Sequence, residues 1–202
     1  ERDLRLVTPG GPSQRCRLIV GDMPEEVVTK SNFGVDNAVE IKTMPLVVNG
    51  QLYSGWIGTI ATMGAPDSGH YRISAKAGQT LVCELQARTL KPYIEEAVPG
   101  WLDACLTLYE ASGRRLKYVD DFGTSPDPVL FHKVDKDAEY LLEVRDVIYR
   151  SGHDFVYRLR VGPLPYVTHI FPLGGRRGTE VTVETRGVNL SRDSLTLKIP
   201  AD

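Results

Sequence analysis

Apolar and polar residues alternate with a period of two through most of the chain, which predicts β-strands rather than helices. The alternation is clearest at residues 138–146 (AEYLLEVRD) and 154–162 (DFVYRLRVG), where one side of each segment is apolar and the other carries charges. We interpret these two segments as a half-buried antiparallel hairpin whose loop is VIYRSGH. Shorter alternating runs predict further strands at 45–49, 51–57, 70–75, 80–88, 103–110, 115–119 and 129–134. One short helix is expected at 91–98, ended by Pro99-Gly100.

Turns that contain glycine separate these strands at short intervals. Asn49-Gly50, Ala77-Gly78 and Ser112-Gly113 each place a glycine where a tight turn needs a positive φ. Strands of this length and spacing predict an all-β protein with a jelly-roll-like antiparallel β-sandwich.

Two breaks in the pattern divide the chain, VGDMPEEVV at 20–28 and VGPLPYVTHIFPLGG at 161–175. Between them we predict one β-sandwich domain at residues 30–162, which is an ordinary domain size. Residues 1–22 and 165–202 hold only two or three candidate strands each. Pieces this small do not bury a core alone, so we expect them to be partial β-modules.

Charge and hydropathy narrow the range of partners. The 202 residues carry 24 Lys and Arg against 26 Asp and Glu, a net charge of −2. This balance lacks the basic excess of a nucleic-acid-binding protein, so no nucleic-acid partner is expected. No apolar run approaches the roughly 18 residues of a membrane span. The chain starts at Glu1 without a signal peptide, and we expect this start to be a boundary set by processing or cloning.

The cysteines Cys16, Cys83 and Cys105 form neither the even set of a disulfide framework nor a zinc-ligand spacing. In TLVCELQAR the alternation puts Cys83 on the apolar side, so we expect it in the core. In LDACLTLY the alternation leaves Cys105 on the side opposite the apolar residues Leu102, Ala104, Leu106 and Leu108. A disulfide between Cys83 and Cys105 is disfavoured by this arrangement.

Several spaced segments carry a family resemblance. AGQTLVCELQAR, LDACLTLYEASGRRLKYVDD, DPVLFHKV, AEYLLEVRD and FVYRLRVGPLP resemble the bacterial pre-peptidase C-terminal domain, in the form found in large secreted planctomycete proteins. The resemblance covers about residues 30–162. The segments at 1–22 and 165–202 resemble the last and the first strands of Ig-like IPT/TIG modules. We hypothesise that these two flanks pack together as one composite Ig-like unit.

The resemblance implies a jelly-roll β-sandwich without catalysis of its own, located outside the cytoplasm in a secreted or cell-surface protein. Neighbouring modules of the same polypeptide are the implied partners. Relatives hold calcium through an acidic segment that resembles Glu-x-Glu-Pro-Asn-Asp. Here the matching residues 28–33 read VTKSNF, and only Asp67 remains of a second acidic pair. Calcium prefers six to eight oxygen ligands, so we expect the usual site to be absent and no cofactor to be required.

Acidic residues gather in VDDFGTSPDP, where Asp120, Asp121 and Asp127 form a candidate for weak calcium binding, with Asp103 as an extra ligand. The spacing does not match an EF-hand loop. The alternative is a solvated turn whose aspartates bind backbone amides, and this interpretation is favoured.

Aromatic residues are the candidates for ligand binding. Trp101, Tyr93 and Trp56 are placed where stacking on a sugar ring is feasible, and Tyr53, Tyr109, Tyr118 and Tyr149 are further candidates. The alternative is that the tryptophans pack in the core or at its rim.

No arrangement of nucleophile, base or metal ligands indicates an enzyme. His70, His132, His153 and His169 match no metalloprotease motif, and we expect them at turns with solvent-facing rings. The glycine-rich segment PLGGRRGTEV is followed by a predicted strand, so it lacks the helix N-terminus that phosphate sites use. We therefore interpret Arg176-Arg177 as part of a turn between modules and not as a phosphate site.

Two functions remain after these exclusions. The first is a non-catalytic accessory β-sandwich, a spacer or interaction domain of a large secreted or cell-surface bacterial protein. The alternative is a dedicated binding module for an extracellular polysaccharide or fibrous protein. Exposed aromatic residues on one sheet face would favour the alternative, and apolar residues buried at module junctions would favour the spacer.

Overall fold

The computed structural model describes residues 2–52, 68–90, 102–152 and 154–201. These residues contain no α-helix, and the expected helix at 91–98 lies outside them. The elements, in chain order, are β1 (Arg2–Leu4), β2 (Val7–Thr8), β3 (Gly11–Pro12), β4 (Cys16–Leu18), β5 (Glu25–Val27), the 3-10 turn η1 (Val35–Asn37), β6 (Val39–Ile41), β7 (Leu46–Gln51), β8 (Ser68–Ala75), β9 (Thr80–Gln86), β10 (Ala104–Glu110), β11 (Arg115–Val119), β12 (Val129–Lys133), β13 (Ala138–Asp146), β14 (Val156–Gly162), β15 (Tyr166–Phe171), β16 (Glu180–Val188) and β17 (Ser194–Lys198). The prediction of an all-β protein is confirmed.

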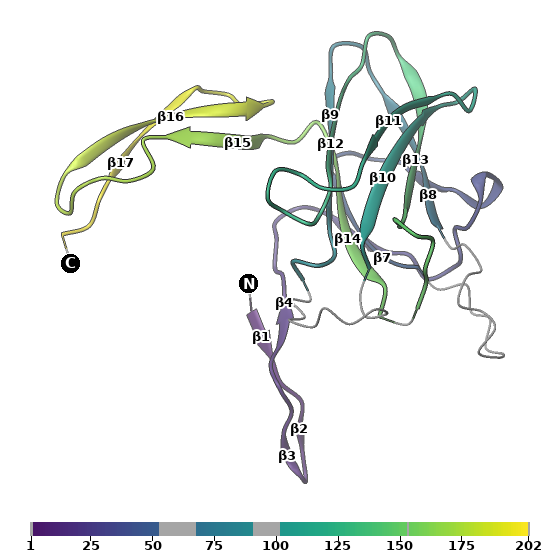
Figure 1. The fold of residues 1–202 in the computed structure, drawn as a ribbon, viewed down its shortest axis with the longest axis horizontal. Coiled ribbons are helices and arrows are strands. Elements are labelled where there is room, and N and C mark those ends of the chain that lie inside the picture. The colour runs from purple at the N-terminus through teal and green to yellow at the C-terminus, as the bar shows by residue number, and fades with distance from the viewer. Residues whose placement is uncertain (1, 53–67, 91–101, 153, 202) are drawn as a thin grey trace.

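Two five-stranded sheets form the central sandwich (Figure 1). The first, called here the β13 sheet, has the order β11-β10-β13-β8-β6, and the second, the β14 sheet, has the order β12-β9-β14-β7-β5. Pairing is antiparallel except at one edge of each sheet, where β6 runs parallel to β8 and β5 runs parallel to β7. The inner sides of both sheets share one core, whose largest fully buried side chains include Tyr71, Ile73, Leu81, Leu85, Leu106, Leu108, Leu142 and Leu159.

The predicted hairpin of residues 138–146 and 154–162 is wrong, because these segments lie in different sheets. β13 pairs with β10 and β8, whereas β14 pairs with β9 and β7. Their predicted apolar sides are confirmed, since Tyr140, Leu142, Tyr157 and Leu159 are all buried in the shared core. Two amphipathic strands bury the same sides whether they pair in one sheet or face each other across a sandwich. Alternation alone therefore does not distinguish the two arrangements.

The turn predicted at Asn49-Gly50 is also wrong, because β7 runs straight through Gly50. A Cβ at Gly50 would lie 2.3 Å from Cζ of Tyr157, and one at Gly69 would lie 2.5 Å from its hydroxyl oxygen. The two glycines make room for this ring, whose hydroxyl lies 2.6 Å from that of Tyr71. Gly50 is therefore needed for the packing of the Tyr157 ring and not for a turn. The other two turns form as predicted, each at a glycine with positive φ.

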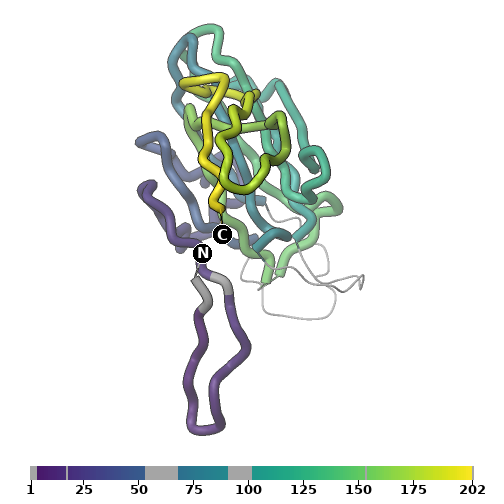
Figure 2. The backbone as a smooth tube through the Cα atoms, turned by 90° about the vertical axis from the view of Figure 1, so that its left-hand side faces the viewer, coloured from purple at the N-terminus to yellow at the C-terminus, as the bar shows by residue number. Residues whose placement is uncertain are grey.

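The two flanks do not form a composite unit. Within the described residues, β1 pairs only with β4, β2 pairs with β3, and β15, β16 and β17 form a separate sheet. Figures 1 and 2 show the N-terminal ribbon projecting below the sandwich, while β15–β17 lie beside its upper part. The hypothesis is wrong because the C-terminal sheet packs on the sandwich itself, through Tyr166 and Val188. The domain limits 1–22, 30–162 and 165–202 stay predictions.

The cysteine predictions agree with the structure. Cys83 is fully buried in the shared core, and burial raises the pKa of its thiol to about 12. Cys105 lies on the other side of its strand, outside that core, but it is buried there as well. All three cysteines are free thiols.

We predict that Gly50→Ala lowers the free energy of unfolding by about 1–3 kcal/mol, because the new methyl group overlaps the Tyr157 ring. The measurement is urea-induced unfolding followed by circular dichroism. Gly174→Ala is the matched control, since no atom lies within 4 Å of the added Cβ and φ is not positive there. Equal midpoints for the two variants would contradict the packing described for Tyr157.

Candidate ligand-binding face

The loop that follows β13 is held by Asp146, a fully buried carboxylate at the end of that strand. It accepts hydrogen bonds from the backbone N–H groups of Asp103 (3.0 Å), Ile148 (3.0 Å) and Arg150 (3.2 Å). The Arg150 guanidinium adds two more, at 3.0 and 2.8 Å, and neutralises the charge. A buried carboxylate with this number of donors fixes the loop backbone around it.

This loop places Tyr149 beside Arg145 of β13. The guanidinium carbon of Arg145 lies 4.3 Å from the Tyr149 ring centre and 5.7 Å from that of Tyr118 on β11. The same guanidinium donates from Nη1 to the carbonyl oxygens of Asp146 (3.0 Å) and Val147 (3.1 Å). Tyr118 and Tyr149 remain 37% and 49% exposed. The outer side of the β13 sheet thus carries two tyrosine rings held by one cation, and we call these three side chains the tyrosine platform.

Polar groups continue from the platform across the same sheet. The Tyr109 hydroxyl donates to Glu143 at 3.0 Å, and the Glu143 carboxylate lies 3.9 Å from Nε of Arg145 and 3.9 Å from Nε2 of His70. Burial raises the pKa of Tyr109, and it raises the pKa of Tyr118 to about 12. Both phenols are therefore protonated hydrogen-bond donors at neutral pH.

His70 corrects the expectation of solvent-facing histidines at turns, because it is buried inside β8. Its Nδ1 accepts the N–H of Gly34 at 3.2 Å, and its backbone bonds to Asn32 in both directions. The ring fastens the segment before β6 onto the sheet, a long-range role that no local pattern reveals. His132 stacks edge-on against Tyr140, His169 lies in β15, and His153 is outside the described residues.

The acidic residues of 120–127 do not converge. Asp127 is buried and accepts the backbone N–H groups of Ala87 (3.0 Å), Arg88 (2.8 Å) and Thr89 (3.0 Å), as well as the Thr89 hydroxyl. Asp120 and Asp121 are exposed, and Asp103 lies 3.5 Å from Nη1 of Arg88. Among the described residues, no group of three or more His, Cys, Asp or Glu is arranged to hold a metal ion. The expectation that these aspartates form a turn rather than a calcium site stays a prediction.

The aromatic candidates Trp101, Tyr93 and Trp56, and Tyr53 with them, lie outside the described residues. Their role in ligand binding stays a prediction. Of the remaining aromatic candidates, the structure brings Tyr118 and Tyr149 together with Arg145, a residue that the sequence marked only as a charge on the outer side of its strand.

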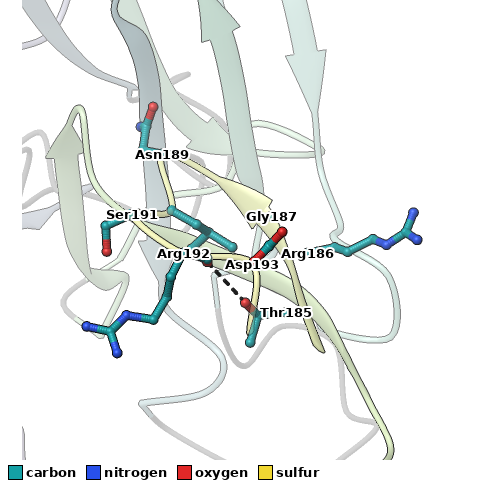
Figure 3. A pocket seen from close by; sticks show the side chains of 8 residues that line it. Thr185, Arg186, Gly187, Asn189, Ser191, Arg192 and Asp193 are labelled. Carbon is teal, nitrogen blue, oxygen red and sulfur yellow. Dashed lines mark hydrogen bonds between the residues drawn. The ribbon is translucent and has the colours of Figure 1, made fainter. Parts of the chain in front are cut away.

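An open hollow lies at the turn between β16 and β17 (Figure 3). Its two arginines, Arg186 and Arg192, point away from each other, and the Thr185 hydroxyl donates to the Arg192 carbonyl at 3.3 Å. The hollow therefore does not gather its cations around one position. No helix in the described ranges has the length and hydropathy to cross a membrane.

Comparison with known proteins gives one partial relative in sequence. No protein-family model matches the chain. Over 109 residues, 53% of the chain, it is 29% identical to a probable subtilase-type serine protease of Deinococcus radiodurans. The chain covers 14% of the length of that curated relative.

Two solved structures are similar at low scores. The pre-peptidase C-terminal domain of a collagenase from Bacillus anthracis is 14% identical, with a TM-score of 0.38, and the match covers 70% of this chain and 100% of that one. PliG of Aeromonas hydrophila, a periplasmic inhibitor of g-type lysozyme, is 14% identical, with a TM-score of 0.37, and the match covers 69% and 98%. Scores this low do not establish a common fold, so the all-β class is taken from the sheets themselves.

We predict that Asp127→Asn destabilises the protein by about 1–3 kcal/mol, because an amide NH₂ would face backbone N–H groups that now share the carboxylate. Thermal unfolding measures the loss. Asp121→Asn, an exposed change in the same loop, is the control and should leave the melting temperature unchanged. Equal melting temperatures would show that the carboxylate does not hold the backbone of residues 87–89.

We also predict that millimolar calcium leaves the melting temperature equal to that measured in EDTA, because the Asp127 carboxylate already binds backbone amides. A ligand that binds only the folded state raises its stability in proportion to the logarithm of its concentration. An increase of several degrees in calcium, lost in Asp120→Asn, would reveal a cation site in the acidic loop.

Proposed function

We propose that the chain is a non-catalytic accessory β-sandwich of a larger secreted or cell-surface bacterial protein, in which it holds a neighbouring β-module in a fixed position. The observation that carries this proposal is the junction between the sandwich and the sheet β15–β17. An apolar cluster separate from the main core lies there, on the outer side of β9 and β12.

The junction cluster combines residues from the sandwich with residues beyond it. Val82, Val129 and Leu164 are buried, and Met23, Phe122, Phe131, Tyr166 and Val188 pack against them. The rings of Phe122, Phe131 and Tyr166 meet edge to face, with centres 5.3–5.6 Å apart in all three pairs. Such aromatic contacts are directional, so they restrict rotation as well as bury surface.

Asn189 adds polar bonds across the same junction. Its side-chain Nδ2 donates to the carbonyl oxygens of Thr80 (2.8 Å) and Leu164 (2.9 Å). The residue itself has φ 55°, a conformation that asparagine tolerates better than most residues. One side chain thus joins the end of β16 to the start of β9 and to the connection before β15.

The sheet β15–β17 has the pattern of one layer of a larger module. Val181 pairs with Leu197 and Val183 with Leu195, which gives the sheet one apolar side, and both leucines are exposed. An antiparallel sheet with one apolar side is normally packed against a second layer. This supports the proposal that residues 165–202 belong to an adjacent IPT/TIG-like module of the same polypeptide.

The sequence resemblance to the pre-peptidase C-terminal domain, in its planctomycete form, supports the accessory role. The partial similarity to the subtilase-type protease is in line with a domain attached to an exported enzyme. On this proposal the chain works outside the cytoplasm, and its first partners are the modules on either side.

A second candidate function is the binding of an extracellular polymer. It is favoured by the tyrosine platform, whose two exposed rings lie on the side of the sandwich that the junction does not use.

We predict that the double change Tyr166→Ala and Asn189→Ala frees the C-terminal sheet from the sandwich, because it removes ring contacts and both side-chain hydrogen bonds. Small-angle X-ray scattering should then give a larger radius of gyration. Thr182→Ala on the polar side of the same sheet is the control. An unchanged scattering profile in the double variant would contradict the proposed rigid junction.

A further inference from the structure

We infer that the tyrosine platform is a binding site for a neutral polysaccharide, with sugar rings packed on Tyr118 and Tyr149. This inference rests on the second candidate function, polymer binding, and names its site and ligand class. It is independent of the rigid junction, which lies on the other sheet.

The side chains have the chemistry that sugars require. A tyrosine presents an apolar ring face together with a hydroxyl group, which matches a pyranose with its C–H faces and ring of hydroxyls. Tyr118 and Tyr149 supply two such rings, and the centres of both lie within 6 Å of the Arg145 guanidinium carbon. Next to the rings, the Tyr109 hydroxyl donates its hydrogen to Glu143, so its oxygen and the Glu143 carboxylate are both acceptors for sugar hydroxyl groups along the same sheet.

The platform is built before any ligand arrives. Tyr149 has φ 63°, a conformation that is unfavourable for a non-glycine residue and persists only where its surroundings impose it. Asp146 imposes it here, since its carbonyl accepts the Tyr149 N–H at 3.0 Å and its carboxylate holds the residues on either side. A ring fixed in this way loses little conformational entropy on binding.

The charges of the site favour a neutral polymer. The Arg145 cation is balanced by Glu143, and the Asp146 carboxylate is paired with Arg150. A further carboxylate, Asp120, lies 3.4 Å from the Tyr118 hydroxyl. An anionic polymer would meet this acidic group without a spare cation, whereas a neutral glycan meets hydrogen-bonding groups and apolar ring faces.

The experiment is a pull-down of the full 202-residue chain on insoluble cellulose and chitin, with collagen as the competing protein polymer and an anionic polymer, alginate gel, as the charge control. We expect retention on cellulose or chitin.

Tyr118→Ala and Tyr149→Gly should each weaken binding to the retaining polymer by at least about tenfold. Glycine is chosen at 149 because it accepts the positive φ, so the loop is expected to fold without the ring. Phe171→Ala, which removes an exposed aromatic ring from β15, is the matched control and should bind like the unchanged chain.

Each outcome decides the inference. Retention on collagen alone or on alginate alone overturns it, as does the absence of retention on both neutral polymers. Retention on cellulose or chitin that survives both tyrosine changes keeps the polymer-binding function but removes this site. Loss of retention in both tyrosine variants, with unchanged melting temperature and with Phe171→Ala unaffected, supports the tyrosine platform.

Discussion

The constraint on which the rest of the structure depends is that β13 and β14 must both bury one apolar side in a single core. They do so from different sheets, and the chain between them therefore crosses from one sheet to the other at the end of the sandwich. Tyr157 of β14 enters the core only because Gly50 and Gly69 leave space for its ring. The chain leaves the β13 sheet at the end of β13, where Asp146 is buried. The loop that Asp146 holds places Tyr149 next to Arg145 on the outer side of the β13 sheet.

Much of this could be predicted from the chain alone, because alternation records which side of a strand is buried. The inner positions Tyr140, Leu142, Leu159 and Cys83 are all in the core as expected. The pairing of strands could not be predicted in the same way, since it depends on contacts between residues far apart in the sequence. Gly50 shows the same limit, because a glycine beside an asparagine has the local pattern of a turn, and only the distant Tyr157 gives it another role.

The candidate site was predictable only in its residue types. Tyrosines 118 and 149 were recognisable as aromatic candidates, but their partner Arg145 comes from a third segment and looks locally like any outward-facing charge. The burial of polar side chains could not be predicted from the sequence pattern either. Arg158 points away from the core as expected, yet it is buried, because it lies close to Gly21 and pairs with Glu25 at the start of β5. Coverage of an outer sheet face by a distant segment leaves no periodic signal in the strand that it covers.

The two surfaces that support a function lie on opposite sides of the sandwich, and this separation has a consequence for how the domain works. The junction cluster occupies the outer side of the β14 sheet, whereas the tyrosine platform occupies the outer side of the β13 sheet. A ligand on the platform therefore does not compete for space with the module held at the junction. With the rigid junction proposed above, the orientation of the platform relative to that module would be fixed as well. A domain of this design would hold a polymer at a set position beside its neighbour, so the spacer function and the binding function are compatible in one molecule.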